Sequence, residues 1–346
     1  MIAWTLLTLG AVALLNWLVY RVLTRQRRDI VAIKRPGERR FMHVAPAGTT
    51  AEDQWPYALM AENAYRDAWT AAQPSHLLGN AQRPVSAALG DPAAGVFAWR
   101  GRTASPPPLP LPGWVRWDDF PSASLKSECT DKQLFFEVWQ TGHPATTVAI
   151  VFRGTVPRYV NNWIANFRWL IHLPNDAYDI VRNSVAPEFA RQIRARMAEG
   201  SLAGDVVLVS AGHSLGGGLA QQLAYALPWR EQGIPTVTRA YVFDPSPVTG
   251  FSDVDNWTDL EGTEDKLTTS RIYEYREILS YVRWIKSLLV VDKPPPAISA
   301  YRYNFSPLKA QHGWANAILL HSMALLAHGL YEAALHERRK HLAPPQ

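Results

Sequence analysis

Residues 212–216 read Gly-His-Ser-Leu-Gly, a G-x-S-x-G pattern in which a serine lies between two glycines. A short apolar strand at Val206 to Ser210 precedes the pattern and a helical stretch follows it, which is the context in which a serine hydroxyl is presented on a sharp turn. Glycines are required at so tight a corner because side chains would collide with the strand or the helix. The pattern therefore predicts Ser214 as a nucleophile, and an ordinary structural turn is the alternative.

A serine nucleophile needs hydrogen-bond donors for the oxyanion that forms when it attacks a carbonyl group. The backbone N–H of Leu215, at the start of the helix after the turn, is one predicted donor and gains from the helix dipole. The second is predicted in the loop after an earlier strand, Ala149 to Phe152, which runs through Arg153 into Thr155. The backbone N–H of Thr155, with its hydroxyl, is the candidate, and a simple strand-ending turn is the alternative.

Three segments together resemble the class 3 lipases, the group typified by fungal triacylglycerol lipases: Phe152 to Thr155, Asn162 with Trp163, and residues 212–217. The likeness extends over residues 55–335. It implies an α/β-hydrolase fold, a triad in the chain order serine, acid, histidine, an oxyanion threonine or serine after the Arg-Gly pair, and no metal or organic cofactor.

The chain departs from the pattern of this family in three places. The family usually has an aspartate where this chain has Asn166, and an alanine where it has Gly218. The stretch from Pro74 to Gly113 is rich in Pro, Gly and Ala and reads as an insertion with extended polyproline structure toward its end. These departures bear on the substrate more than on the reaction.

The base of such a triad is expected late in the chain, where His312, His321 and His328 are the candidates. His321 is our choice because it begins a His-Ser-Met segment that resembles the one in which the family places its histidine, just before or at the start of the final helix. His312 is the alternative. His213, beside the nucleophile, is expected to point away into the packing of the turn.

The acid is predicted to be Glu277, with Asp244 as the alternative. Glu277 follows the strand 272–275 and precedes two apolar residues, an arrangement that resembles the family's acid position. Asp244 follows the preceding strand, 241–243, where the family has a turn and not its acid. Glu274 lies on a strand and is expected to be a solvated or paired residue.

The first twenty residues carry no charged side chain and are dominated by apolar ones, a length that spans the hydrocarbon core as a helix. We therefore predict a transmembrane anchor at 1–23, with a buried helix as the alternative. Eight Lys and Arg residues follow within 21–40, and Trp17 and Tyr20 precede them as an interfacial belt would. This arrangement favours a membrane surface over nucleic acid as the partner, and it predicts a cytoplasmic catalytic domain.

The remaining chain is predicted to comprise a basic tether at 24–50 and one domain at 51–341. With 346 residues, 47% hydrophobic and 19% charged, the chain can bury a sizeable core, and its single cysteine excludes an internal disulfide. Strands are predicted at 134–140, 146–152, 205–210, 240–243 and 271–275, and helices at 52–70, 178–199 and 215–226. Their alternation predicts a mostly parallel sheet covered by helices on both faces.

Two apolar stretches bear on the substrate, 161–174 after the oxyanion loop and 281–291 after the acid. Each is either core or, for the first, a lid that opens against a bilayer. We expect a lipase or phospholipase that cleaves carboxylic esters of lipids through an acyl-enzyme on Ser214. The alternatives are an esterase, thioesterase or acyltransferase on a small soluble substrate, and a membrane-tethered binding module without activity.

Overall fold

The computed structural model describes residues 29–35, 38, 41, 43–46, 50–65, 111–154, 176–227, 234–251, 266–280, 282–283, 297–305 and 320–342, together with Leu14 and Leu18. Its strands are β1 Ile30–Lys34, β2 His43–Pro46, β3 Trp114–Arg116, β4 Phe136–Gly142, β5 Ala145–Phe152, β6 Leu202–His213, β7 Val237–Phe243, β8 Thr268–Glu274 and β9 Ile298–Tyr303. Its helices are α2 Ala51–Asn63, α6 Ala123–Asp131, α8 Ala177–Ile180, the π-helical η1 Val181–Val185, α9 Ala186–Ala198, α10 Leu215–Ala226 and α13 Met323–Leu342.

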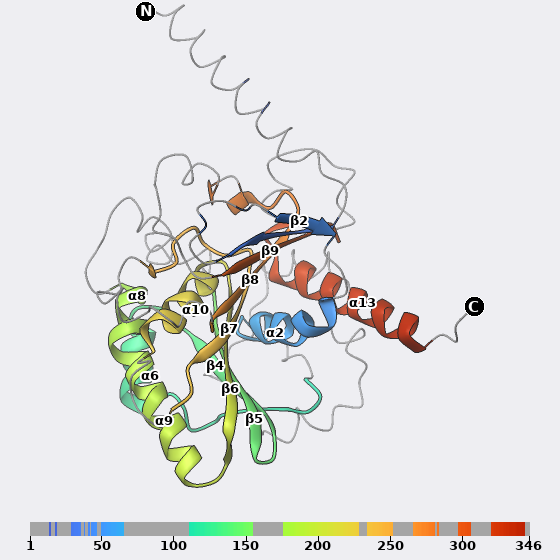
Figure 1. Ribbon diagram of the computed structural model, residues 1–346. Coiled ribbons are helices and arrows are strands. Elements are labelled where there is room, and N and C mark those ends of the chain that lie inside the picture. Colours follow the sequence, from blue (N-terminus) through green and yellow to red (C-terminus); the bar gives the residue numbers. More distant parts are fainter. Residues whose placement is uncertain are drawn as a thin grey trace, which may run out of the picture.

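All nine strands form one sheet in the order β2-β1-β9-β8-β7-β6-β5-β4-β3 (Figure 1). The five central strands, β5 to β9, run parallel, and antiparallel strands extend the sheet at both edges. The predicted α/β fold is confirmed, and the predicted parallel arrangement holds for the centre of the sheet. Because parallel strands share a direction, the carboxyl ends of β6, β7 and β8 lie together at one edge.

Helices cover both faces of the sheet, with α6, α8, α9 and α10 on one face and α2 and α13 on the other (Figure 1). Side chains of a strand alternate between the faces, so β5 contributes to both cores. Ile150 and Phe152 pack under α10, whereas Ala149 and Val151 face α2 and α13. The two apolar layers fix the sheet between the helices and hold its strand ends in place.

The sequence located the central elements but missed others. Helix α10 has the predicted bounds, and β6 is longer than its predicted apolar segment. The helix predicted at 178–199 appears as α8, η1 and α9, and the π-helical turn directly precedes the first turn of α9, where Pro187 lies. Proline has no N–H for the regular helical bond and its ring collides with the preceding turn, which accounts for the change of helix type.

Residues 30–46 differ from the predicted tether, because they contribute two strands to the sheet. β1 pairs antiparallel with β9, with Ile30 opposite Arg302 and Lys34 opposite Ile298, and β2 pairs with β1. A five-residue strand in a basic segment gives little periodicity, and its partner lies more than 260 residues further along the chain. Such a long-range pairing leaves no local sequence signal.

No helix within the described residues is long and apolar enough to cross a membrane. The predicted anchor lies outside those residues except for Leu14 and Leu18, which are helical. The predicted insertion at 74–113 also lies outside them, apart from residues 111–113.

The pairing of β1 with β9 predicts where the chain can be shortened. Deletion of 1–28 should leave the thermal unfolding midpoint of the domain within about 2 °C of that of the full chain, because no described strand is lost. Deletion of 1–47 removes β1 and β2 and should lower the midpoint by roughly 5 °C or more. Thermal unfolding followed by circular dichroism measures both. Equal midpoints for the two truncated chains would contradict a structural role for β1.

Candidate active site

Ser214 is the single residue between β6 and α10, and its backbone is strained. Its φ of 56° and ψ of −123° are values that residues other than glycine rarely adopt. Two backbone hydrogen bonds hold it: the N–H of Ser214 donates to the carbonyl of Phe243 at 2.9 Å, and its carbonyl accepts from the N–H of Ser246 at 2.8 Å. The neighbouring strand β7 thus fixes the turn that presents the serine hydroxyl.

Glycines around Ser214 are required by close backbone contacts. A Cβ on Gly216 would lie 2.2 Å from the carbonyl oxygen of Phe152, and one on Gly212 would lie 2.2 Å from that of Gly216. A Cβ on Gly218 would lie 2.1 Å from the hydroxyl of Tyr178, which donates a hydrogen bond to a backbone carbonyl. The departure from the family pattern at Gly218 therefore has a structural reason, since the Tyr178 hydroxyl occupies the space an alanine would need.

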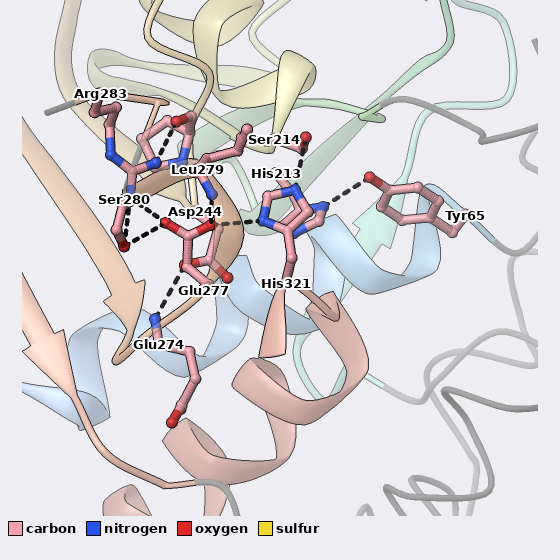
Figure 2. A network of polar contacts seen from close by, with 11 residues as sticks. Tyr65, His213, Ser214, Asp244, Glu274, Glu277, Leu279, Ser280, Arg283 and His321 are labelled. Carbon is pink, nitrogen blue, oxygen red and sulfur yellow. Dashed lines mark hydrogen bonds and ion pairs between the residues drawn. The ribbon is translucent and has the colours of Figure 1, made fainter. Parts of the chain in front are cut away.

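The structure brings together Ser214, His321 and Glu277, the three residues selected from the sequence (Figure 2). Nε2 of His321 lies 2.9 Å from Oγ of Ser214, and Nδ1 of His321 lies 3.0 Å from Oε2 of Glu277. Ser214 follows β6, Glu277 follows β8, and His321 lies two residues before the start of α13, so all three side chains meet at the carboxyl edge of the parallel strands.

Glu277 is a buried carboxylate whose oxygens both have donors. Oε2 accepts from the N–H of Leu279 at 2.6 Å and faces His321, while Oε1 accepts from the hydroxyl of Ser280 at 2.8 Å and from the guanidinium of Arg283. Burial raises the pKa of Glu277, but the charge of Arg283 and the hydrogen bond from His321 outweigh it and lower the pKa to about 2. Because Glu277 is ionised, Nδ1 of His321 carries the proton and donates a hydrogen bond to Glu277. Nε2 then accepts a hydrogen bond from the hydroxyl of Ser214.

Asp244, the alternative acid, lies beside this series and not in it. It directly follows β7, and its Oδ1 accepts a hydrogen bond from the N–H of Glu274 at 3.0 Å. Burial and the nearby charge of Glu277 raise the pKa of Asp244 well above its usual value. The carboxyl group hydrogen-bonded to the histidine is that of Glu277.

His213 is buried as predicted, but it packs against the proposed base instead of pointing away from it. Its ring lies 4.8 Å from that of His321, centroid to centroid, at an interplanar angle of 37°. Its Nδ1 lies 2.7 Å from the hydroxyl of Tyr65. Burial and then the charge of His321 lower the pKa of His213, and burial raises that of Tyr65, so Tyr65 donates to a neutral His213. No sequence signal identified Tyr65, which follows α2 and reaches the site only through the fold.

The end of β5 passes directly beside Ser214. A Cβ on Gly154 would lie 2.2 Å from the hydroxyl of Tyr65 and 3.0 Å from Cβ of Ser214, and the backbone of Gly154 hydrogen-bonds the same hydroxyl. Thr155, the predicted oxyanion residue, follows Gly154 and lies outside the described residues. Leu215, the other predicted donor, is the first residue of α10, where a backbone N–H has no carbonyl partner within its helix.

Other predictions concern parts of the chain that are not described. The alternative base His312 and the apolar stretch 161–174 lie outside the described residues, as does most of 281–291. His328 is described and lies within α13, past the residues that contact Ser214.

Among the described residues, one group of side chains has the spacing for a metal ion: His213, Asp244 and His321, whose ligand atoms lie within 4.8 Å of one another. Both ring nitrogens of His321 are, however, hydrogen-bonded to Ser214 and Glu277. The arrangement therefore fits a proton-transfer site better than a metal centre.

Comparison with known proteins adds no family to these observations. No protein-family model matches the chain, and no curated protein matches it at a significant level.

The close contact of Gly216 with β5 can be tested by comparing two Gly→Ala substitutions. Gly216→Ala should lower the free energy of unfolding by about 3 kcal/mol or more, because the added Cβ overlaps a backbone oxygen. Gly204→Ala is the matched control, since a Cβ at Gly204 meets nothing within 4 Å, and its effect should be within about 0.5 kcal/mol. Chemical denaturation measures both, and a similar small effect for the two would contradict the tight packing of the turn.

Proposed function

We propose that this chain is a serine hydrolase of the α/β-hydrolase type that cleaves carboxylic esters of lipids, as a lipase or phospholipase. The observation that carries the proposal is the hydrogen-bonded series Ser214–His321–Glu277, with distances of 2.9 and 3.0 Å. The resemblance of the motifs around Thr155 and Ser214 to class 3 lipases supports the same reaction.

In the proposed mechanism, Nε2 of His321 takes the proton of Ser214 as Oγ attacks the ester carbonyl carbon. The resulting oxyanion is stabilised by the N–H groups of Leu215 and Thr155. Glu277 stabilises the imidazolium, which then gives its proton to the departing alcohol as the ester bond breaks. Water, deprotonated by the same histidine, attacks the acyl-enzyme and releases the fatty acid and the free serine.

The lipid substrate is supported by features of the sequence. The apolar segment 1–23 and the basic residues after it suit a membrane anchor with the catalytic domain on the cytoplasmic side. The apolar stretch 161–174 suits a surface that contacts acyl chains.

An esterase, thioesterase or acyltransferase on a small soluble substrate would use the same three residues and is the second candidate. A binding module without activity is less favoured, because the strained backbone of Ser214 would have no use in it and strain of this kind is usually retained where it serves a function.

Reaction with a fluorophosphonate tests the proposed nucleophile. The phosphonate should label the chain covalently at Ser214, because its tetrahedral adduct resembles the proposed transition state. Ser214→Ala should abolish labelling and lower kcat/KM for ester hydrolysis by roughly 10⁴-fold or more, and His321→Ala should have a similar effect, because the residues act as a unit. Mass spectrometry of labelled peptides identifies the labelled residue. Full labelling of the Ser214→Ala variant would contradict the assignment of Ser214 as the nucleophile.

Substrate class is decided with a panel of phospholipids, acylglycerols and short-chain esters in detergent. A lipase or phospholipase should prefer long acyl chains, whereas a preference for the shortest esters or for thioesters would favour the second candidate. Ser214→Ala is the blank for every substrate.

The anchor is tested by fractionation. The full chain should sediment with washed membranes, and the chain lacking 1–28 should remain in the supernatant while hydrolysing a soluble ester at the same rate, since β1 is intact. If the shortened chain still sediments, another part of the protein holds it to the membrane.

A further inference from the structure

A second buried carboxyl group lies at the proposed active site. Asp244 follows β7 and Glu277 follows β8, the adjacent parallel strand, and both side chains are almost fully buried. A carboxylate oxygen of Asp244 lies within 4.8 Å of ring nitrogens of both His213 and His321. Figure 2 places Asp244 beside Glu277, next to the two histidines. The base is thus approached by carboxyl groups from two neighbouring strands.

The position of Asp244 beside His321 is energetically unfavourable in two respects. Its φ of 40° lies in the left-handed region, which is favourable for glycine and costs other residues free energy. Oδ1 has a hydrogen bond from the backbone of Glu274, but Oδ2 is buried and has no hydrogen-bond partner among the residues that the structure describes. A strained backbone and an unsatisfied buried oxygen at one residue are features that persist mainly at functional positions.

The charges around Asp244 decide its protonation. Glu277 and Glu274 are the acidic groups facing it, Arg283 is the cation, and His213 and His321 are the histidines. Burial and the charge of Glu277 raise the pKa of Asp244 well above its usual value, and the charge of Arg283 offsets only part of this. Burial and these charges therefore favour the neutral form of Asp244 and the ionised form of Glu277.

We propose that Asp244 is a second acid of this site, a positioning residue whose carboxyl group can support His321 in place of that of Glu277. This inference rests on the proposed hydrolase function. Loss of the charge on Glu277 removes the main electrostatic repulsion on Asp244. It also breaks the ion pair between Glu277 and Arg283, so that the positive charge of Arg283 is left to act on Asp244. Asp244 loses its proton to solvent more easily, and its carboxylate needs to move by less than 2 Å to reach hydrogen-bond distance of His321.

The test is a double-mutant cycle on kcat/KM for a soluble ester, with Glu277→Gln, Asp244→Asn and the double variant in the full chain. Loss of the acid alone costs serine hydrolases roughly 10⁴-fold. Because Asp244 substitutes for the missing charge, Glu277→Gln should lose only about 10²-fold, and the double variant about 10⁴-fold. Asp244→Asn alone should lose about threefold, since asparagine is neutral like the protonated aspartic acid it replaces.

The pH profile separates this role from a merely structural one. The ratio of kcat/KM for Glu277→Gln to that for the double variant cancels every pH-dependent contribution that the two variants share. The ratio should rise with pH through a single ionisation, that of Asp244. In the Glu277→Gln background, Asp244→Gly should lower kcat/KM as much as Asp244→Asn does. Glycine removes the carboxyl group and also relieves the backbone strain, so an equal loss assigns the effect to the carboxyl group and not to the strain.

Three results would overturn the inference. A double variant equal to Glu277→Gln at every pH means that Asp244 gives no support. A ratio that does not change with pH assigns the effect of Asp244 to packing. A large fall in kcat/KM for Asp244→Asn, with none for Glu277→Gln, would make Asp244 the main acid of the site. Fluorophosphonate labelling of wild-type Ser214 is measured in parallel, because absence of both labelling and turnover in the wild type would overturn the proposed function itself.

Discussion

The backbone of Ser214 lies in a conformation that its neighbours must enforce, and the rest of the site depends on this constraint. Two hydrogen bonds to the chain at the end of β7 hold the residue. Gly216 allows α10 to approach β5 closely, which brings Gly154 to Ser214. The apolar layers on both faces of the sheet keep these strand ends in register, so packing far from Ser214 fixes the position of its hydroxyl.

Burial, neighbouring charges and hydrogen-bond donors together favour the ionised form of Glu277 and the neutral form of Asp244. Glu277 receives donors on both oxygens and faces Arg283, whose guanidinium also lies 4.2 Å above the ring of Tyr273 and donates to a backbone carbonyl. Asp244, one strand away, has a donor on only one oxygen. A buried charge is stable only when it is paired and hydrogen-bonded, so the same environment keeps Glu277 ionised and Asp244 neutral.

The sequence predicted the parts of the molecule whose signals are local. The apolar run of β6, the glycines of the turn and the start of α10 are contiguous, and together they identify Ser214 without a tertiary model. The positions of His321 and Glu277, 107 and 63 residues away, were inferred from a resemblance and not from periodicity. The contact between Tyr65 and His213 was missed, because only the packing of α2 against the sheet brings the two side chains together.

Strand β1 escaped prediction for the same reason, since its pairing with β9 is a long-range property. The direction of β1 shows at which edge the chain enters the sheet. Because β1 runs antiparallel to β9, with Ile30 opposite Arg302, the chain enters the sheet at the carboxyl edge of the parallel strands, the edge that carries Ser214.

Only nine residues separate Tyr20 from Ile30, and an extended chain of that length reaches about 30 Å. If residues 1–20 lie in a bilayer, this edge of the sheet is confined to within about one domain diameter of the lipid headgroups. The edge that carries Ser214 and the membrane would then be on the same side of the molecule, and the direction of one short strand would set this orientation.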